Sequence, residues 1–254
     1  MPPQQDLLRN QLLNRLGSKD FASLAEHLHH VDLPRGFLIA EADEIIQYYY
    51  FMESGIASMV ASSPDGLKAE VGLLGRDGIA PTAAVLYADR VAFDIVIQVR
   101  GDGHRIASAA LEQALAGSVT IRKLLAQFVQ TLATQAAFTA LSNANHHVDE
   151  RLARWILMCH DRVDDGKIAL THEYMAIMLA VRRPSVTTAL HVLEGNGLIY
   201  ADRGVITIRD RAALETFAGD AYGQPESEYA RMFGPVAGAA TAPRQRVHQQ
   251  ALDK

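Results

Sequence analysis

The sequence predicts an α+β fold, with strands in the N-terminal half and helices in the C-terminal half. Between Pro34 and about Arg105, short stretches rich in Ile, Val, Tyr and Phe alternate with turn residues, which is typical of strands. From Ser108 onward, apolar residues recur every three or four positions, which indicates amphipathic helices. Because strands and helices are segregated along the chain, we expect separate β and α layers rather than a parallel α/β sheet.

The composition indicates a soluble globular protein that stays in a reducing compartment. The chain has 254 residues, of which 49% are hydrophobic and 21% charged, and this length suits one or two domains. No apolar run approaches the roughly 18 residues of a membrane span, and the first residues lack the features of a secretory signal. The only cysteine is Cys159, so one chain cannot form a multi-cysteine metal centre. We therefore expect a cytoplasmic protein without membrane contacts.

The strand region predicts a compact β-roll or barrel after a short helical start. Residues 5–30 have helical spacing, with Ser18 as a candidate N-cap for a helix over Lys19–His29. Asp65 and Gly66 form a strong hairpin signal, because glycine adopts positive φ without steric cost. Gly101, Asp102 and Gly103 read as a further break. The expected strands fall within Ile45–Met52, Gly55–Ala61, Leu67–Leu74 and Val91–Val99.

A long helix from about Val119 to Leu141 follows a short one over Ser108–Ala116. Its main apolar stripe has 4-3-4 spacing and is typical of a coiled coil; it consists of Ile121, Leu125, Phe128, Leu132 and Ala136. A second apolar set widens the stripe: Leu124, Val129, Ala133 and Ala137. One face can pack on the β region while the other meets a second chain, and we assign the main stripe to dimerisation. The alternative is a helix buried within one chain.

The segment from Ile168 to Phe217 reads as helix, tight turn, helix and β-hairpin. Thr171 caps a helix over His172–Leu179, and Pro184 suits the first turn of a second helix from Arg183 to about Asn196. Two short strands, 198–200 and 205–208, flank a turn at Asp202, Arg203 and Gly204. This order is that of a winged helix-turn-helix. A further helix, 147–160, precedes it, and we expect residues 222–254 to be a disordered tail.

The second helix has the character of one that enters the major groove of DNA. Its apolar positions Val186, Leu190 and Leu193 face a core, while its start is polar. Arginine can read guanine through two hydrogen bonds, and serine and threonine suit phosphates or base edges. The net charge is −5, so a DNA-binding surface has to be a local basic patch. The candidate contacts are Thr171, Arg182, Arg183, Pro184, Ser185, Thr187, Thr188, His191 and Arg203, with Arg209 as a further wing candidate.

These residues resemble the Crp/Fnr family of bacterial transcription regulators. The likeness lies in Thr171, in the run from Ala180 to Thr187, in Leu193-Glu194 and in Gly197-Leu198-Ile199, with Val148–Leu157 resembling the helix after the dimerisation helix. It implies a cyclic-nucleotide-binding-like β-roll over 1–116, a dimerisation helix over 117–143 and a DNA-binding domain over 144–221. It also implies a homodimer on palindromic double-stranded DNA, with RNA polymerase as a further candidate partner.

The resemblance also implies where base reading and effector binding would occur. Arg183, Pro184 and Thr188 correspond to the family's base-reading positions. Pro184 departs from the family pattern because its side chain has no polar group. Cyclic-nucleotide sensors of the family carry Gly-Glu and Arg-Ser pairs, which align with Pro81-Thr82 and Arg90-Val91. Thr82 and Arg90 remain the effector candidates, but the carboxylate and one amide donor are lost. We therefore expect no response to cyclic AMP.

We assign no cofactor and no metal. The N-terminal cysteines of an Fnr-type cluster are absent. Haem stays open, because His27, His29 and His30 cluster and His27 and His30 could share a helix face; paired histidines near helix ends are more often surface residues. Two other function classes compete. The helix-turn-helix could serve partner contacts without binding DNA, as the acidic pI of 6.0 and Pro184 suggest. An enzyme has little support, since no nucleophile–base pair or phosphate-binding glycine loop is recognisable.

Overall fold

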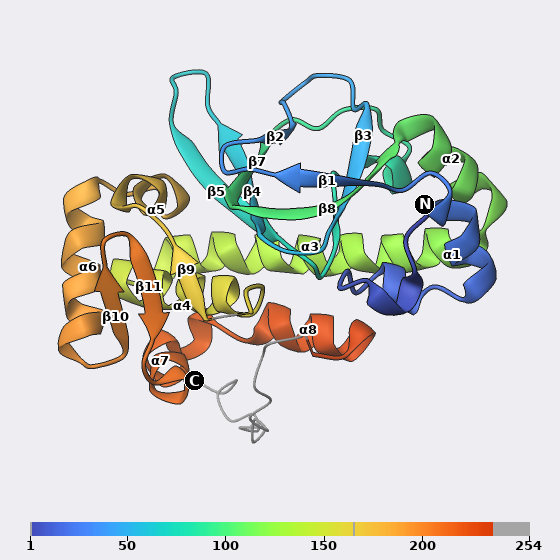
Figure 1. Cartoon of the computed structure of the whole chain (residues 1–254). Coiled ribbons are helices and arrows are strands. Elements are labelled where there is room, and N and C mark those ends of the chain that lie inside the picture. The colour runs from blue at the N-terminus through green and yellow to red at the C-terminus, as the bar shows by residue number, and fades with distance from the viewer. Residues whose placement is uncertain (1, 165, 236–254) are drawn as a thin grey trace, which may run out of the picture.

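The computed structural model describes residues 2–164 and 166–235. A β-roll lies on one side of a long central helix, and a smaller helical domain lies at that helix's C-terminal end (Figure 1). This arrangement confirms the α+β fold that the sequence predicts. None of the described helices is long and apolar enough to span a membrane. The N-terminal elements are η1 (Gln5–Leu7), η2 (Leu13–Arg15), α1 (Ser18–Ala25), β1 (His29–Leu33), β2 (Leu38–Ala40), β3 (Tyr48–Met52), β4 (Ile56–Ser62), β5 (Lys68–Leu74), β6 (Ile79–Ala80), η3 (Ala83–Leu86), β7 (Asp94–Val99), β8 (Gly101–Ala107) and α2 (Ser108–Gly117).

The second half of the described chain contains the central helix and the helical domain. Its elements are α3 (Val119–Asn145), α4 (Val148–His160), β9 (Lys167–Ala169), α5 (His172–Met178), α6 (Arg183–Gly195), β10 (Ile199–Asp202), β11 (Val205–Ile208), α7 (Arg211–Ala218), η4 (Gly219–Ala221) and α8 (Gln224–Phe233). The roll consists of two four-stranded sheets with the orders β1-β8-β3-β6 and β2-β7-β4-β5, and the domain has a three-stranded sheet, β10-β11-β9. Every strand pair in these sheets is antiparallel.

Two local predictions about the roll are wrong. Gly101 and Gly103 do not end a strand but lie within β8, which pairs with both β1 and β3. A Cβ on Gly101 would lie 2.2 Å from the carbonyl oxygen of Ser54, so glycine is needed for close approach of the backbones. The predicted helix over Lys19–His29 ends at Ala25, and His29 and His30 belong to β1. The hairpin at Asp65 and Gly66 is confirmed, since β4 and β5 pair on either side of it.

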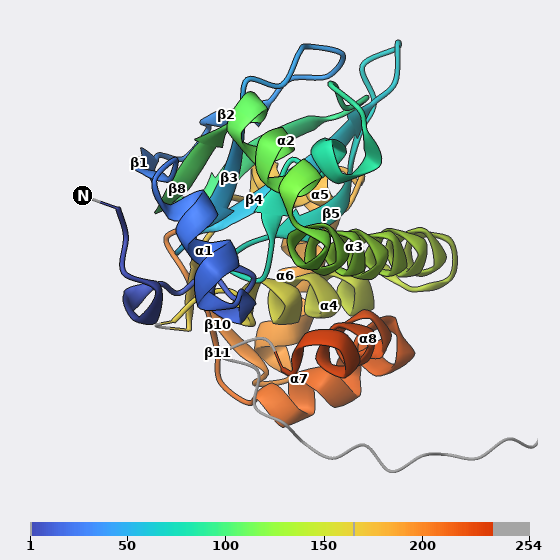
Figure 2. The same cartoon turned by 90° about the vertical axis from the view of Figure 1, so that its right-hand side faces the viewer.

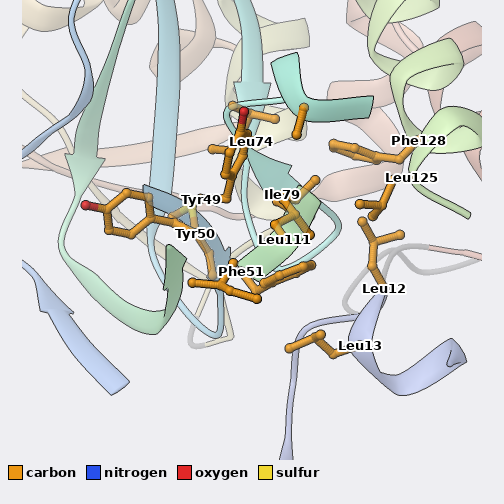
Figure 3. Close-up of a cluster of buried hydrophobic side chains, with 14 of the residues drawn as sticks. Leu12, Leu13, Tyr49, Tyr50, Phe51, Leu74, Ile79, Leu111, Leu125 and Phe128 are labelled. Atoms are coloured by element: carbon orange, nitrogen blue, oxygen red, sulfur yellow. The ribbon is translucent and has the colours of Figure 1, made fainter. Parts of the chain in front are cut away.

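The core of the roll is closed by the N-terminal segment and by α3. Leu12 and Leu13 are fully buried, although they come from a segment with only single turns of 3-10 helix. Figure 3 shows Leu12 pointing towards Leu125 and Phe128 of α3, beside the cluster around Phe51. The central helix is therefore part of the same core as the roll and is fixed relative to it.

The structure corrects the role assigned to the main stripe of α3. Ile121, Leu125, Phe128 and Leu132 are buried against the roll of their own chain, with exposed fractions of 1–7%, and Ala136 is half-buried. The prediction that this stripe forms a dimer contact is wrong because the roll already covers it. The opposite side of α3 is exposed at Ala126, Ala133, Ala137, Ala140 and Leu141, while Leu124 and Val129 are half-buried.

The prediction of a disordered tail over 222–254 is wrong for its first part. Residues Gln224–Phe233 form α8, which packs along α3 and beside α4 and α7 (Figures 1 and 2). Pro225, Tyr229 and Phe233 recur every four residues and are buried, so they form one apolar face in an otherwise polar segment. The rest of the predicted tail, from residue 236 onward, lies outside the described residues.

Buried polar contacts join the roll to the helical domain. Arg162, which follows α4, donates to both carboxylate oxygens of Asp77 at 3.2 and 2.7 Å, and both side chains are buried. Trp155 Nε1 donates to Glu70 Oε1 on β5 at 2.9 Å. Burial raises the pKa of Glu70 to about 7. Near them, Cys159 is a fully buried core thiol, and this burial raises its pKa.

Candidate nucleic-acid interface

The predicted helix-turn-helix is present, with α5 and α6 joined by a tight turn. Thr171 caps α5 through its side chain, which accepts from the backbone N–H of Tyr174 at 3.3 Å. The chain reverses at Ala180, which has a φ of +49°. Arg182 is the N-cap of α6, and Pro184 lies in its first turn. Proline fits there because the first N–H groups of a helix have no partner within it.

The two faces of α6 differ as the sequence predicts. Val186, Ala189, Leu190 and Leu193 are buried against the domain core. Arg182, Arg183, Pro184, Thr188 and His191 are exposed, and Ser185 and Thr187 are half-buried. The apolar back therefore anchors the helix, and its first two turns present a polar edge to solvent. Such an edge is what a helix needs to reach base edges in the major groove.

The hydrogen bonds of α6 determine which of its groups are free. The hydroxyl of Thr188 donates to the carbonyl of Pro184 at 3.2 Å. Thr187 Oγ1 lies 3.1 Å from His172 Nδ1 and so links α6 to α5. Among the described residues, no carboxylate forms an ion pair with Arg182 or Arg183. The guanidinium groups at the start of α6 thus keep their donors available for an anionic partner.

The wing is a short hairpin beside α6. Strands β10 and β11 pair from Ile199 with Ile208 to Asp202 with Val205. Arg203 and Gly204 both have positive φ, at +46° and +80°, which is the backbone of a two-residue hairpin turn. Arg203 is exposed at the tip and Arg209 is exposed after β11. The sequence did not predict β9, which adds a third strand next to β11.

One contact from a neighbouring helix holds the end of α5, and a second joins two helices behind the helix-turn-helix. Arg151 of α4 donates to the carbonyl of Leu179 at the end of α5. Arg211 of α7 pairs with the buried carboxylate of Asp161 at 2.7 Å. Neither arginine belongs to the exposed edge of α6.

One contact at the site comes from the roll and carried no signal in the sequence. Arg35, in the turn between β1 and β2, places its guanidinium 4.4 Å from the ring centroid of Tyr174. Its Nη2 lies 3.4 Å from Thr171 Oγ1. The two partners are 136 positions apart in the chain, so no local pattern could have joined them.

The effector candidates Thr82 and Arg90 do not line a common cavity. Thr82 is half-buried beside Pro81, at a cavity of only about 10 Å³. Arg90 is exposed and donates to the carbonyl of Asp43 at 3.2 Å. A larger cavity of about 550 Å³ lies on η3, α2 and α3, with Asp89, Glu112 and Arg122 among its lining residues. The structure therefore does not assemble the two candidates into one binding site.

The histidines near the N-terminus are dispersed over different structural elements. His27 follows α1 and His30 lies in β1, so the two do not share a helix face. His30 Nε2 lies 2.9 Å from the carboxylate of Asp102. Within residues 2–164 and 166–235, no group of three or more His, Cys, Asp and Glu side chains could hold a metal ion.

The fold and the site define a winged helix-turn-helix protein with a β-roll and a long central helix. The family model of the Crp-like helix-turn-helix domain matches residues 150–217, from α4 into α7. The chain therefore contains a Crp-like helix-turn-helix domain and has the fold of the Crp/Fnr transcription regulators. Comparison of the sequence with curated proteins finds no match.

Solved structures of several regulators are similar over most of their length. CLP of Xanthomonas campestris, a c-di-GMP responsive global regulator, has 14% identity and a TM-score of 0.62, over 76% of this chain and 100% of that one. FixK2 of Bradyrhizobium japonicum has 17% identity and a TM-score of 0.63, over 75% and 96%. A CRP-family transcriptional regulator of Thermus thermophilus, TTHB099, has 19% identity and a TM-score of 0.61, over 74% and 96%. At these identities the likeness shows the fold.

Proposed function

We propose that this protein is a transcription regulator that binds double-stranded DNA sequence-specifically as a homodimer. The observation that carries the proposal is the polar edge of α6, where Arg182 and Arg183 are exposed without carboxylate partners beside Thr188 and His191. The opposite, apolar face of α6 is buried in the core of the Crp-like domain. The net charge of −5 leaves the rest of the chain acidic, so nucleic acid would be attracted to this edge locally.

The homodimer rests on the exposed side of α3. Ala126, Ala133, Ala137 and Ala140 follow a spacing of 7, 4 and 3 and are all exposed. Small residues at this spacing allow two helices to pack closely, as in a coiled coil. A twofold axis along α3 would present two α6 helices, and half-sites about 34 Å apart would match them. The expected operator is therefore a palindrome.

We further propose that cyclic AMP is not the effector. Pro81 offers no N–H to a phosphate, and Thr82 offers no carboxylate to a ribose hydroxyl. The narrow space at these residues supports the same conclusion, because a cavity of about 10 Å³ holds no nucleotide. No contact in the described residues brings Arg90 to that cavity.

Selection of bound sequences from random duplex DNA, using purified protein without added ligand, tests the proposal. We expect enrichment of a palindrome, and addition of cyclic AMP should leave its affinity unchanged. Enrichment of a single half-site would contradict the dimer. No enrichment, with or without ligand, would favour a partner-binding helix-turn-helix, a reading that exposed Pro184 supports. Steep loss of affinity with added salt would argue against that alternative.

A further inference from the structure

We infer that the β-roll itself supplies a contact to the DNA backbone, through Arg35. This inference rests on the proposed function and adds a residue outside the Crp-like domain to its interface. Arg35 lies between β1 and β2, on a turn that is fixed to the sheet. Gly36 N–H donates to Ile97 O at 2.8 Å, and Ile97 N–H donates to Phe37 O at 2.9 Å. The backbone of the turn is therefore held by β7, while the Arg35 side chain projects to the surface.

The guanidinium of Arg35 is oriented by neutral groups only. It stacks 4.4 Å from the Tyr174 ring centroid and lies 3.4 Å, by Nη2, from Thr171 Oγ1. No carboxylate forms an ion pair with it in the part of the chain that the structure describes. A guanidinium has five N–H donors, so most of them remain available. An arginine that is oriented by a ring and a hydroxyl, and that has no carboxylate partner, is well suited to binding a phosphate.

The contact of Arg35 with α5 identifies the phosphate as one of the DNA backbone. When the second helix of a helix-turn-helix lies in the major groove, the first helix crosses the backbone. Here the first helix is α5, and Arg35 contacts both its cap, Thr171, and its first turn, at Tyr174. The next residue, His172, bonds to Thr187 of α6. Arg35 thus lies against the helix that crosses the backbone, next to a residue of that helix that contacts the reading helix.

The test compares Arg35→Gln with the wild-type protein on the operator recovered by selection. Affinity should fall roughly tenfold or more, as expected for loss of a charged hydrogen bond. The slope of log affinity against log salt should become shallower by about 0.9 per protomer, or about 1.8 per dimer. Ethylation of individual phosphates should interfere at one more position per half-site with wild type than with the variant. Arg35→Lys should retain most of the salt slope, because it keeps the charge.

Arg231→Gln is the matched control, because Arg231 is an exposed arginine on α8, paired with Glu228; its affinity and salt slope should equal those of wild type. Unchanged affinity and slope in Arg35→Gln would overturn the inference. Weaker binding with an unchanged slope would also overturn it, since Arg35 would then only position α5 through Tyr174. Wild-type protein that binds no duplex at all would overturn the proposed function, and this contact with it.

Discussion

At the residue scale, Arg183 is the side chain in the first turn of α6 that we propose reads a base. It is exposed, and no carboxylate in the described residues pairs with it. Thr188 has its hydroxyl proton engaged by Pro184 O at 3.2 Å, so its oxygen is left to accept. Pro184 offers a base only an apolar surface. Direct hydrogen bonds from this edge therefore depend mainly on arginine donors.

Arg183→Ala should weaken binding to the selected operator by about 1–3 kcal/mol and relax specificity at one base position per half-site. Arg209→Ala is the comparison, because Arg209 is exposed after the wing and should contact phosphate only. That variant should lose affinity evenly across operator sequences. Competition binding with operators substituted at each base pair measures both effects. A specificity profile for Arg183→Ala identical to that of wild type would contradict its role in reading.

Ionisation of Glu70 lowers the free energy of unfolding as pH rises. Its pKa is raised from 4.5 to about 7, first of all by burial. Below about pH 4.5 the carboxyl is neutral in both states; above it the unfolded chain ionises first, so the free energy of unfolding decreases. The decrease ends near pH 7 and amounts to roughly 3 kcal/mol.

Glu70→Gln should remove that contribution. Urea unfolding of both proteins between pH 4.5 and 8 should show the free energy of unfolding of wild type falling relative to that of the variant as pH rises. Burial also raises the pKa of Glu226, but this group is present in both proteins and cancels in the difference. A difference that does not vary with pH would show that Glu70 is ionised throughout.

At the scale of elements, α3 has one apolar face buried in the core of the roll and one that is exposed. Leu132 is 7% exposed and belongs to the core of the roll, whereas Ala137 is exposed on the other side. Leu132→Ala should lower the free energy of unfolding by about 2–5 kcal/mol, because it leaves a cavity.

Ala137→Glu should leave folding of the protomer intact but convert dimers to monomers in sedimentation velocity. If Ala137→Glu stayed dimeric, the twofold axis would have to lie elsewhere.

The same helix shows what periodicity can predict and what it cannot. The spacing correctly placed Ile121, Leu125, Phe128 and Leu132 on one face, but it did not separate the exposed alanines from that face. The partner of each face depends on which segment packs there, and that is a long-range property. Elements with strong local signals, such as the hairpin at Gly66 and the start of α6 at Pro184, were predicted within a residue or two. Strand β8 was missed because Gly101 and Gly103 serve the close approach of strands that lie far apart in sequence.

At the scale of the whole molecule, the candidate DNA-contact residues were predictable because they belong to one contiguous motif. Arg35 was not, since its relation to Thr171 exists only once the roll and the helical domain are packed together. The same applies to the buried ion pair of Asp77 and Arg162. Asp77 and Arg162 are 85 positions apart, and each acquires its partner only through the tertiary fold.

Asp77→Ala should destabilise the chain by about 3–5 kcal/mol, because it leaves the buried guanidinium of Arg162 without its carboxylate. Asp89→Asn is the control, because Asp89 pairs with Arg90 at the surface, at 3.5 Å; its effect should stay within about 1 kcal/mol. Chemical denaturation of both variants measures the difference. Equal effects would mean that the buried pair contributes no more than a surface one.

The placement of α8 has a consequence for how the chain folds as it is synthesised. Tyr229 donates to Asp77 O at 2.8 Å, and its Oη lies 2.9 Å from Gln11 Oε1, so the last described helix packs on residues from the beginning of the chain. Domains generally fold from the N-terminal side while translation continues. The surface of α3 on which α8 packs must therefore remain uncovered on the ribosome until the residues of α8 emerge. A nascent chain arrested before residue 224 should bind a hydrophobic dye that the released protein does not.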